Sequence, residues 1–222
     1  SRPGRPDTLS KFTMAKCAES SIASCVKTME NLFRKVKKNP NKYFNSDNLI
    51  KGLQHILEVC DAKKDKKYFA LKELIKSQKN PKSMIIFTTY ISTVDYIYTQ
   101  LNKDFPKFEL FKMIGKDSSQ KRQRIIGDFA PMAQGKKKRG KSKWKILICT
   151  DCISEGHNLQ DANMIVNYDL HWTPLKLIQR IGRLDRATFN ARTFEVWNMY
   201  PGDKAFENLV GMQARLWSRD AM

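Results

Sequence analysis

The stretch Ser83–Thr88 (SMIIFT) decides the fold of this chain. It is a continuous apolar run that ends in small polar residues, a pattern typical of a strand buried on both faces of a parallel sheet. A second run of the same kind, Lys145–Thr150 (KILICT), follows further along the chain. Parallel strands need long crossover connections, which are usually helical, so helices are expected around both runs.

The surrounding sequence alternates between helix and strand patterns. Apolar spacing and turn residues predict further strands over 108–113, 164–167 and 193–199, and helices over 67–77, 92–103, 118–129, 174–181 and 205–217. Strands and helices in turn predict an α/β fold, in which a parallel sheet carries helices on both faces.

The first part of the chain has a different pattern. Apolar residues recur near helical spacing over 9–38, without Gly or Pro, which predicts one long or broken helix. A second helix is expected over 49–59. We therefore expect a helical arm over residues 1–64, followed by the α/β domain over 65–222.

A basic tract interrupts the expected domain over about 131–144. Four basic side chains follow one another there: Lys136, Lys137, Lys138 and Arg139. The tract has almost no apolar surface to bury, so a mobile loop is expected. A solvated loop and a sequence-independent clamp on nucleic-acid phosphates are equally compatible with this composition.

The charge balance limits the class of partner. Among 222 residues, 41 Lys and Arg against 22 Asp and Glu give a net charge of +19. Such a field attracts polyanions, of which nucleic acid is the commonest for an intracellular protein. No run approaches the roughly 18 apolar residues that cross a bilayer. We expect no membrane partner and an intracellular location, in the cytoplasm or, in a eukaryote, in the nucleus.

Two polar strings follow the later strands. Residues 150–160 read TDCISEGHNLQ, and residues 179–186 read QRIGRLDR. Ligands of open parallel sheets collect at the carboxyl ends of the strands, where the first string is expected. Arg183 and Arg186 are three residues apart, so on a helix they would project from one face toward one polyphosphate. A solvated basic face is the alternative.

The five cysteines do not form a recognisable metal or redox site. Cys149 and Cys152 have CxxC spacing, but there is no second pair and Cys149 ends a buried strand. Packing and reduced thiols are therefore favoured. No metal-ligating residue is predicted, because the histidines are scattered as well.

These strings resemble motifs of the second RecA-like lobe of superfamily 2 helicases and translocases. The QxxGRxxR pattern over 179–186 resembles motif VI, and TDxxSEGxNLQ over 150–160 resembles motif V of the Swi/Snf-like branch, which includes the bacterial ATPase that recycles RNA polymerase. Residues 83–89 resemble motif IV, and 167–174 (NYDLHWTP) are typical of the branch. The resemblance implies a RecA-like fold and a C-terminal motor lobe.

The resemblance implies that this chain takes part in ATP hydrolysis. In these motors ATP and Mg²⁺ lie between two lobes, and the first lobe binds the phosphates and the metal. The chain resembles the second lobe alone, so it is expected to need an N-terminal RecA-like lobe in cis and to be inactive without it. The implied catalytic residues are Arg186 as arginine finger, Arg183 at the γ-phosphate and Gln179. The implied cofactor-binding residues are Glu155, Gly156 and Asn158.

The resemblance also implies contact with a nucleic-acid backbone, with DNA favoured over RNA and no sequence preference. The residues at the implied positions are Thr88, Thr89, Gly115, Arg122 and Thr150.

Two other classes of protein stay open. One is a non-catalytic basic module that binds nucleic acid on the same fold. The other is a parallel-sheet enzyme for small molecules, which would carry a Gly-rich loop after its first strand. Because Ser1 stands in place of an initiator Met, the chain is also expected to be cut from a longer polypeptide.

Overall fold

The structure is a computed structural model that describes residues 16–43, 46–59, 65–80, 83–135, 144–152, 159–171, 174–184 and 193–200. Two compact units make up the chain, Ser1–Leu74 and Ile75–Met222, and the division falls within helix α4 (Lys66–Ser77). The arm and domain proposed to divide after residue 64 stay a prediction.

The first unit contains a helix that is broken and then capped. Residues 16–20 are helical, Ser21 interrupts them, and α2 (Ile22–Lys38) follows. The Ser21 hydroxyl accepts a hydrogen bond from the Ser24 amide at 3.0 Å, which satisfies one of the free donors of the first helical turn. Within the described residues, the predicted helix is therefore a broken one.

Helix α3 (Ser46–Val59) follows the short 3-10 helix η1 (Pro40–Lys42) and pairs with α2. Cys25 and Met29 of α2 form a small buried cluster with Leu53 of α3. This confirms the second predicted helix, which begins three residues earlier than the sequence suggested because Ser46 and Asp47 already belong to its first turn.

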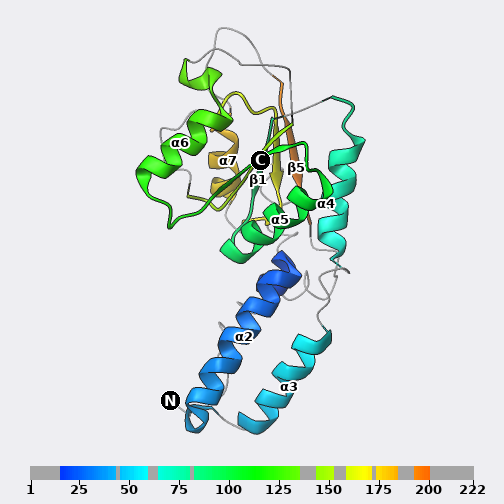
Figure 1. Cartoon of the computed structure of the whole chain (residues 1–222), viewed down its shortest axis with the longest axis vertical. Coiled ribbons are helices and arrows are strands. Elements are labelled where there is room, and N and C mark those ends of the chain that lie inside the picture. Colours follow the sequence, from blue (N-terminus) through cyan, green and yellow to red (C-terminus); the bar gives the residue numbers. More distant parts are fainter. Residues whose placement is uncertain are drawn as a thin grey trace. The chain divides into compact units, whose positions relative to one another are not determined.

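The second unit is built on one parallel five-stranded sheet in the order β2-β3-β1-β4-β5 (Figure 1). The strands are β1 (Ser83–Phe87), β2 (Glu109–Met113), β3 (Lys145–Cys149), β4 (Met164–Asn167) and β5 (Glu195–Asn198). The helices that connect them are α5 (Ile91–Asp104), α6 (Ser119–Phe129) and α7 (Pro174–Ile181). The predicted α/β fold is confirmed; the helix expected over 205–217 lies outside the described residues.

Helices cover both faces of this sheet. The chain steps from β1 out to β2 and then reverses through β3 to β4 and β5. Right-handed crossovers therefore put α5 on one face and α6 with α7 on the other. Figure 1 shows α6 and α7 close together on one side of the strands. On that face Ile85, Phe87 and Leu147 pack with Ile126 and Phe129 of α6.

The CxxC pair belongs to this core. Cys149 is buried at the end of β3, Cys152 packs against the same cluster, and both are free thiols. Burial raises the pKa of the Cys149 thiol well above its ordinary value. Burial also raises the pKa of Cys152, against opposing contributions that include the Thr150 hydroxyl. Packing, as predicted, is the role that the structure supports.

Phe129→Ala should destabilise the second unit strongly. The ring of Phe129 is 0% exposed and meets Phe111 edge-on, with 5.9 Å between ring centroids. Its removal leaves a cavity that should lower the free energy of unfolding by about 3 to 5 kcal/mol in urea titrations. Met132→Ala is the control, because Met132 is 49% exposed and should change stability by less than about 0.5 kcal/mol. Equal losses would contradict this core.

Cys149 and Cys152 should react slowly with iodoacetamide at neutral pH, because only the thiolate is nucleophilic and its fraction falls as the thiol pKa rises. We expect the rate at Cys152 to climb with pH beyond pH 9 in the folded chain, and Cys149 to react only after unfolding. Peptide mass spectrometry measures both. Labelling of Cys152 at pH 7 as fast as a free cysteine would contradict the raised pKa.

Candidate functional site

The carboxyl ends of the parallel strands meet along one side of the sheet. The ladder continues past the strands, since the Thr88 amide donates to the Cys149 carbonyl at 3.0 Å and the Thr150 amide to the Met113 carbonyl at 3.2 Å. The loops after β1, β2 and β3 are therefore neighbours. We call residues 88–89, 114–117, 150–152 and 167–169 the carboxyl edge.

The residues that the resemblance assigns to nucleic acid all lie at this edge or against it. They are Thr88, Thr89, Gly115, Arg122 and Thr150. Arg122 reaches the edge from α6, where its Nη1 donates to the Cys152 carbonyl at 3.1 Å while its buried Nε has no hydrogen-bond partner. A Cβ atom added to Gly115 would stand 3.8 Å from the Cβ of Cys152. The fold thus gathers residues that are far apart in the sequence.

The loop that contains Gly115 is held by Asp117. Its carboxylate accepts hydrogen bonds from the Ile114 amide at 2.8 Å and from Lys121 Nζ at 2.5 Å. Burial acts to raise the pKa of Asp117, but these hydrogen bonds outweigh it and keep the pKa below its ordinary value. The carboxylate is therefore charged at neutral pH and fixes the loop beside α6.

The two threonines after β1 share one acceptor. Thr88 Oγ1 donates to Asp169 Oδ2 at 2.6 Å, and the Thr89 amide donates to the same oxygen at 2.9 Å. Thr88 is fully buried and its hydroxyl is committed to Asp169, whereas Thr89 is exposed. Of this pair, Thr89 presents its side chain at the surface.

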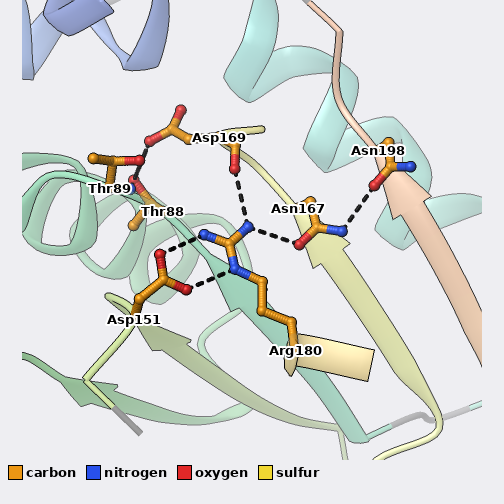
Figure 2. A network of polar contacts seen from close by, with 7 residues as sticks. All are labelled: Thr88, Thr89, Asp151, Asn167, Asp169, Arg180 and Asn198. Atoms are coloured by element: carbon orange, nitrogen blue, oxygen red, sulfur yellow. Dashed lines mark hydrogen bonds and ion pairs between the residues drawn. The ribbon is translucent and has the colours of Figure 1, made fainter. Parts of the chain in front are cut away.

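Helix α7 inserts an arginine into the carboxyl edge (Figure 2). The Arg180 side chain is 2% exposed, and its Nε and Nη2 donate to the two carboxylate oxygens of Asp151 at 2.7 and 2.8 Å. Its Nη1 donates to Asn167 Oδ1 at 2.8 Å and to the Asp169 carbonyl at 3.1 Å. The guanidinium carbon also lies 4.9 Å from the centroid of the Phe87 ring. Every nitrogen of this buried cation is hydrogen-bonded.

The sequence analysis assigned no role to Arg180 or to Asp151. A signal for the arginine exists, because Arg180 stands three residues after the partly buried Leu177, on the same face of α7. A charged residue on the buried face of an amphipathic helix indicates a buried pair. The partner could not be found in this way, since it lies on another segment.

Gln179 and Arg183 are both half-buried near the end of α7. Arg183 lies beyond this helix, which has the predicted bounds, so the projection from one helix face considered for Arg183 and Arg186 does not apply to Arg183. Helix α7 ends at Ile181, and the Arg183 amide donates to the carbonyl of Arg180, three residues back, at 3.3 Å. The Arg183 carbonyl in turn accepts from the Leu159 amide at 3.3 Å, which joins the end of the 150–160 string to the 179–186 string.

Several predicted site residues lie outside the described residues. They are Arg186, Glu155, Gly156, Asn158, Lys136, Lys137, Lys138 and Arg139. The string over 135–142 (GKKKRGKS) has the GxxxxGKS/T spacing of a phosphate-binding loop. Such a loop follows a strand and opens a helix, whereas this string follows the 3-10 helix η3 (Met132–Gln134) and precedes β3. It therefore gives no support to an ATP-phosphate site.

No helix in the described part of the chain is both long and apolar enough to cross a membrane. Within the same ranges, no three His, Cys, Asp or Glu side chains group together in a way that could hold a metal ion.

Curated relatives of the chain are helicases by name. It is 42% identical over 71 residues to the uncharacterized ATP-dependent helicase YqhH of Bacillus subtilis, covering 28% of this chain and 13% of that protein. It is 31% identical over 138 residues to the ATP-dependent RNA helicase HAS1 of Saccharomyces cerevisiae, covering 62% of this chain and 24% of HAS1. The chain thus spans a quarter or less of the length of these two relatives. The predicted preference for DNA gains no support from them.

A solved structure agrees in fold. The crystal structure of the C-terminal part of the Fun30 ATPase domain superposes with a TM-score of 0.55 at 19% identity, over 82% of this chain and 53% of that one. At this identity the likeness concerns the fold alone, so the Swi/Snf-like branch stays a prediction. Residues 66–188, more than half of the chain, match the model of the helicase conserved C-terminal domain. With its RecA-like sheet, the chain therefore belongs to the helicase conserved C-terminal domain family of superfamily 2.

Proposed function

We propose that this chain is the C-terminal motor lobe of an ATP-dependent helicase or translocase. In this proposal it binds a nucleic-acid backbone at the carboxyl edge and presents arginines to a nucleotide held mainly by a second RecA-like lobe. The observation that carries the proposal is the gathering of Thr89, Gly115, Arg122 and Thr150 at one edge of the sheet, next to the helix that leads to Arg183.

The carboxyl edge has the chemistry of a phosphate-binding surface. The Arg122 guanidinium uses one recorded hydrogen bond, to the Cys152 carbonyl, and carries five donors in all. Gly115 and Thr89 add backbone and hydroxyl groups at the same edge of the sheet, and the net charge of +19 attracts a polyanion. Contacts of this kind position a backbone without reading bases, so no sequence preference is expected. Because these contacts involve no base, they also do not use the bases to distinguish RNA from DNA.

The end of α7 has the chemistry of the nucleotide side. ATP supplies the phosphoryl group for transfer, and Mg²⁺ neutralises charge on its phosphates. Arg183 stands where motif VI joins the end of motif V, and Arg186 follows three residues later. Guanidinium groups at these positions would stabilise negative charge that develops during transfer. The sequence contains no Asp-Glu pair, which supports a second lobe as the holder of Mg²⁺.

Arg122→Ala should weaken the binding of single-stranded RNA and DNA by this chain about tenfold and lower the salt dependence by about one counterion. Lys107→Ala is the matched control, because it removes the same charge from an exposed residue before β2, at the opposite end of the sheet. Fluorescence anisotropy from 50 to 200 mM salt measures both variants. Equal losses would show that binding follows net charge and not the carboxyl edge.

Arg186→Ala and Arg183→Ala should each lower the ATP turnover of the full-length protein on the order of 10³-fold, because the lost charge acts mainly in the transition state. Arg186→Ala should leave ATP binding nearly intact, and the 222-residue chain by itself should not hydrolyse ATP. A coupled phosphate-release assay measures turnover, with Lys107→Ala as control. Near wild-type turnover in both arginine variants would refute the motor role and favour the non-catalytic binding module.

A further inference from the structure

We propose that Arg180 is a positioning residue that couples nucleic-acid binding at the carboxyl edge to the nucleotide arginines that follow α7. The inference rests on the proposed function and adds a residue that neither motif resemblance nor sequence reasoning assigned. It follows from the way in which one buried guanidinium joins segments of both expected binding surfaces.

Arg180 holds the loop after β3 on one side. Asp151 directly follows Thr150, the residue expected to touch the nucleic-acid backbone, and both Asp151 oxygens accept from Arg180. Such a bidentate pair fixes the direction of the carboxylate as well as its distance. A shift of Thr150 on nucleic-acid binding therefore moves the Asp151 carboxylate and, through it, the Arg180 guanidinium.

Arg180 holds the end of β4 on the other side. Its Nη1 donates to Asn167 Oδ1 and to the Asp169 carbonyl. The Asn167 amide is itself oriented by β5, since its Nδ2 donates to Asn198 Oδ1 at 2.8 Å. Figure 2 shows the chain of contacts from Asn198 through Asn167 to Arg180.

Asp169 extends this connection to the loop after β1. Its carbonyl accepts from Arg180 while its carboxylate accepts from Thr88 and Thr89. Figure 2 shows Thr88 and Thr89 beside the Asp169 carboxylate, away from Asn167 and Asn198. The loops after β1, β3 and β4 are thus linked through a single side chain of α7.

The two sides of the network differ in burial. On the β4 side Asn167 is 0% exposed and Asp169 is 7% exposed, whereas on the β3 side the side chain of Asp151 is 26% exposed. The contacts to Asn167 and Asp169 anchor Nη1, so a movement of Asp151 acts on Nε and Nη2 and turns the guanidinium about that anchor. Asp151 is therefore the partner that can respond to nucleic acid, and Arg180 passes the response to α7, three residues before Arg183.

The geometry requires a guanidinium. Its donors spread in a plane and reach acceptors on opposite sides, whereas the donors of a lysine all sit on one nitrogen. Arg180→Lys keeps the charge and should lose the bridge. Asp151→Asn keeps the shape and should weaken the same bridge from its other end.

Asp161→Asn is the matched control. The Asp161 carboxylate accepts from the amides of Met132 and Ala133 at 2.8 and 2.7 Å, in the same unit, and has no recorded contact with Arg180. Asp161→Asn should therefore lower stability, because it weakens a carboxylate that accepts two hydrogen bonds. It should not lower the coupling between nucleic-acid binding and ATP hydrolysis.

The experiment measures the stimulation of ATP hydrolysis by saturating single-stranded RNA or DNA in the full-length protein. Arg180→Lys and Asp151→Asn should each lower the stimulation factor by about tenfold, while KM for ATP changes less than twofold. The stimulation factor of the double variant should be no lower than that of the poorer single variant. Asp161→Asn should keep the wild-type factor. Thermal melting checks that all variants are folded.

A second readout uses the 222-residue chain itself. The nuclear magnetic resonance signal of the Arg180 Nε–Hε group should shift when an oligonucleotide binds to the wild-type chain and to Asp161→Asn, but not to Asp151→Asn. A wild-type stimulation factor in a folded Arg180→Lys protein, or an Arg180 Nε–Hε signal that does not shift when nucleic acid binds, would overturn the proposed coupling. Neither result would overturn the proposed function. A wild-type protein that nucleic acid never stimulates would overturn the proposed function and this inference with it.

Discussion

The buried guanidinium of Arg180 requires acceptors on several sides, and the carboxyl edge of the sheet is arranged around that requirement. A cation that is 2% exposed has lost its hydration, and only good hydrogen-bond geometry offsets that cost. Arginine stays protonated at any physiological pH, so the cost cannot be avoided by neutralisation. The acceptors must therefore be in place whenever the domain is folded.

The strand order supplies those acceptors. β1 lies between β3 and β4, so Asp151, the second residue after β3, and Asn167, the last residue of β4, stand on either side of the end of β1. Arg180 lies over Phe87 at that end and bridges to Asp151 on one side and Asn167 on the other. A different strand order would separate the two acceptors and leave a buried charge without its partner. The Arg180–Asp151 ion pair therefore depends on this strand order.

The same arrangement explains why the loops of the candidate site are held in place by hydrogen bonds. The loop after β1 is bound through Asp169, the loop after β2 through Asp117, and the loop after β3 through Asp151 and Arg122. Each of these contacts uses a charged group, and such hydrogen bonds are the stronger ones. The surface that would meet a phosphate backbone is therefore largely preformed, and its parts are linked to α7 through Arg180.

The sequence by itself determined the strands, the connecting helices and the two motif strings, because continuous apolar runs and helical spacing are local patterns that record burial. It also placed Thr88, Gly115 and Thr150 at strand ends, since parallel strands finish on one side. Only the tertiary structure decided that Thr88 is buried against Asp169, that the Arg183 carbonyl accepts from the Leu159 amide, and that Asp151 pairs with Arg180. The physical reason is that polar pairing depends on which strands are neighbours, and the order β2-β3-β1-β4-β5 is set by packing of the whole sheet.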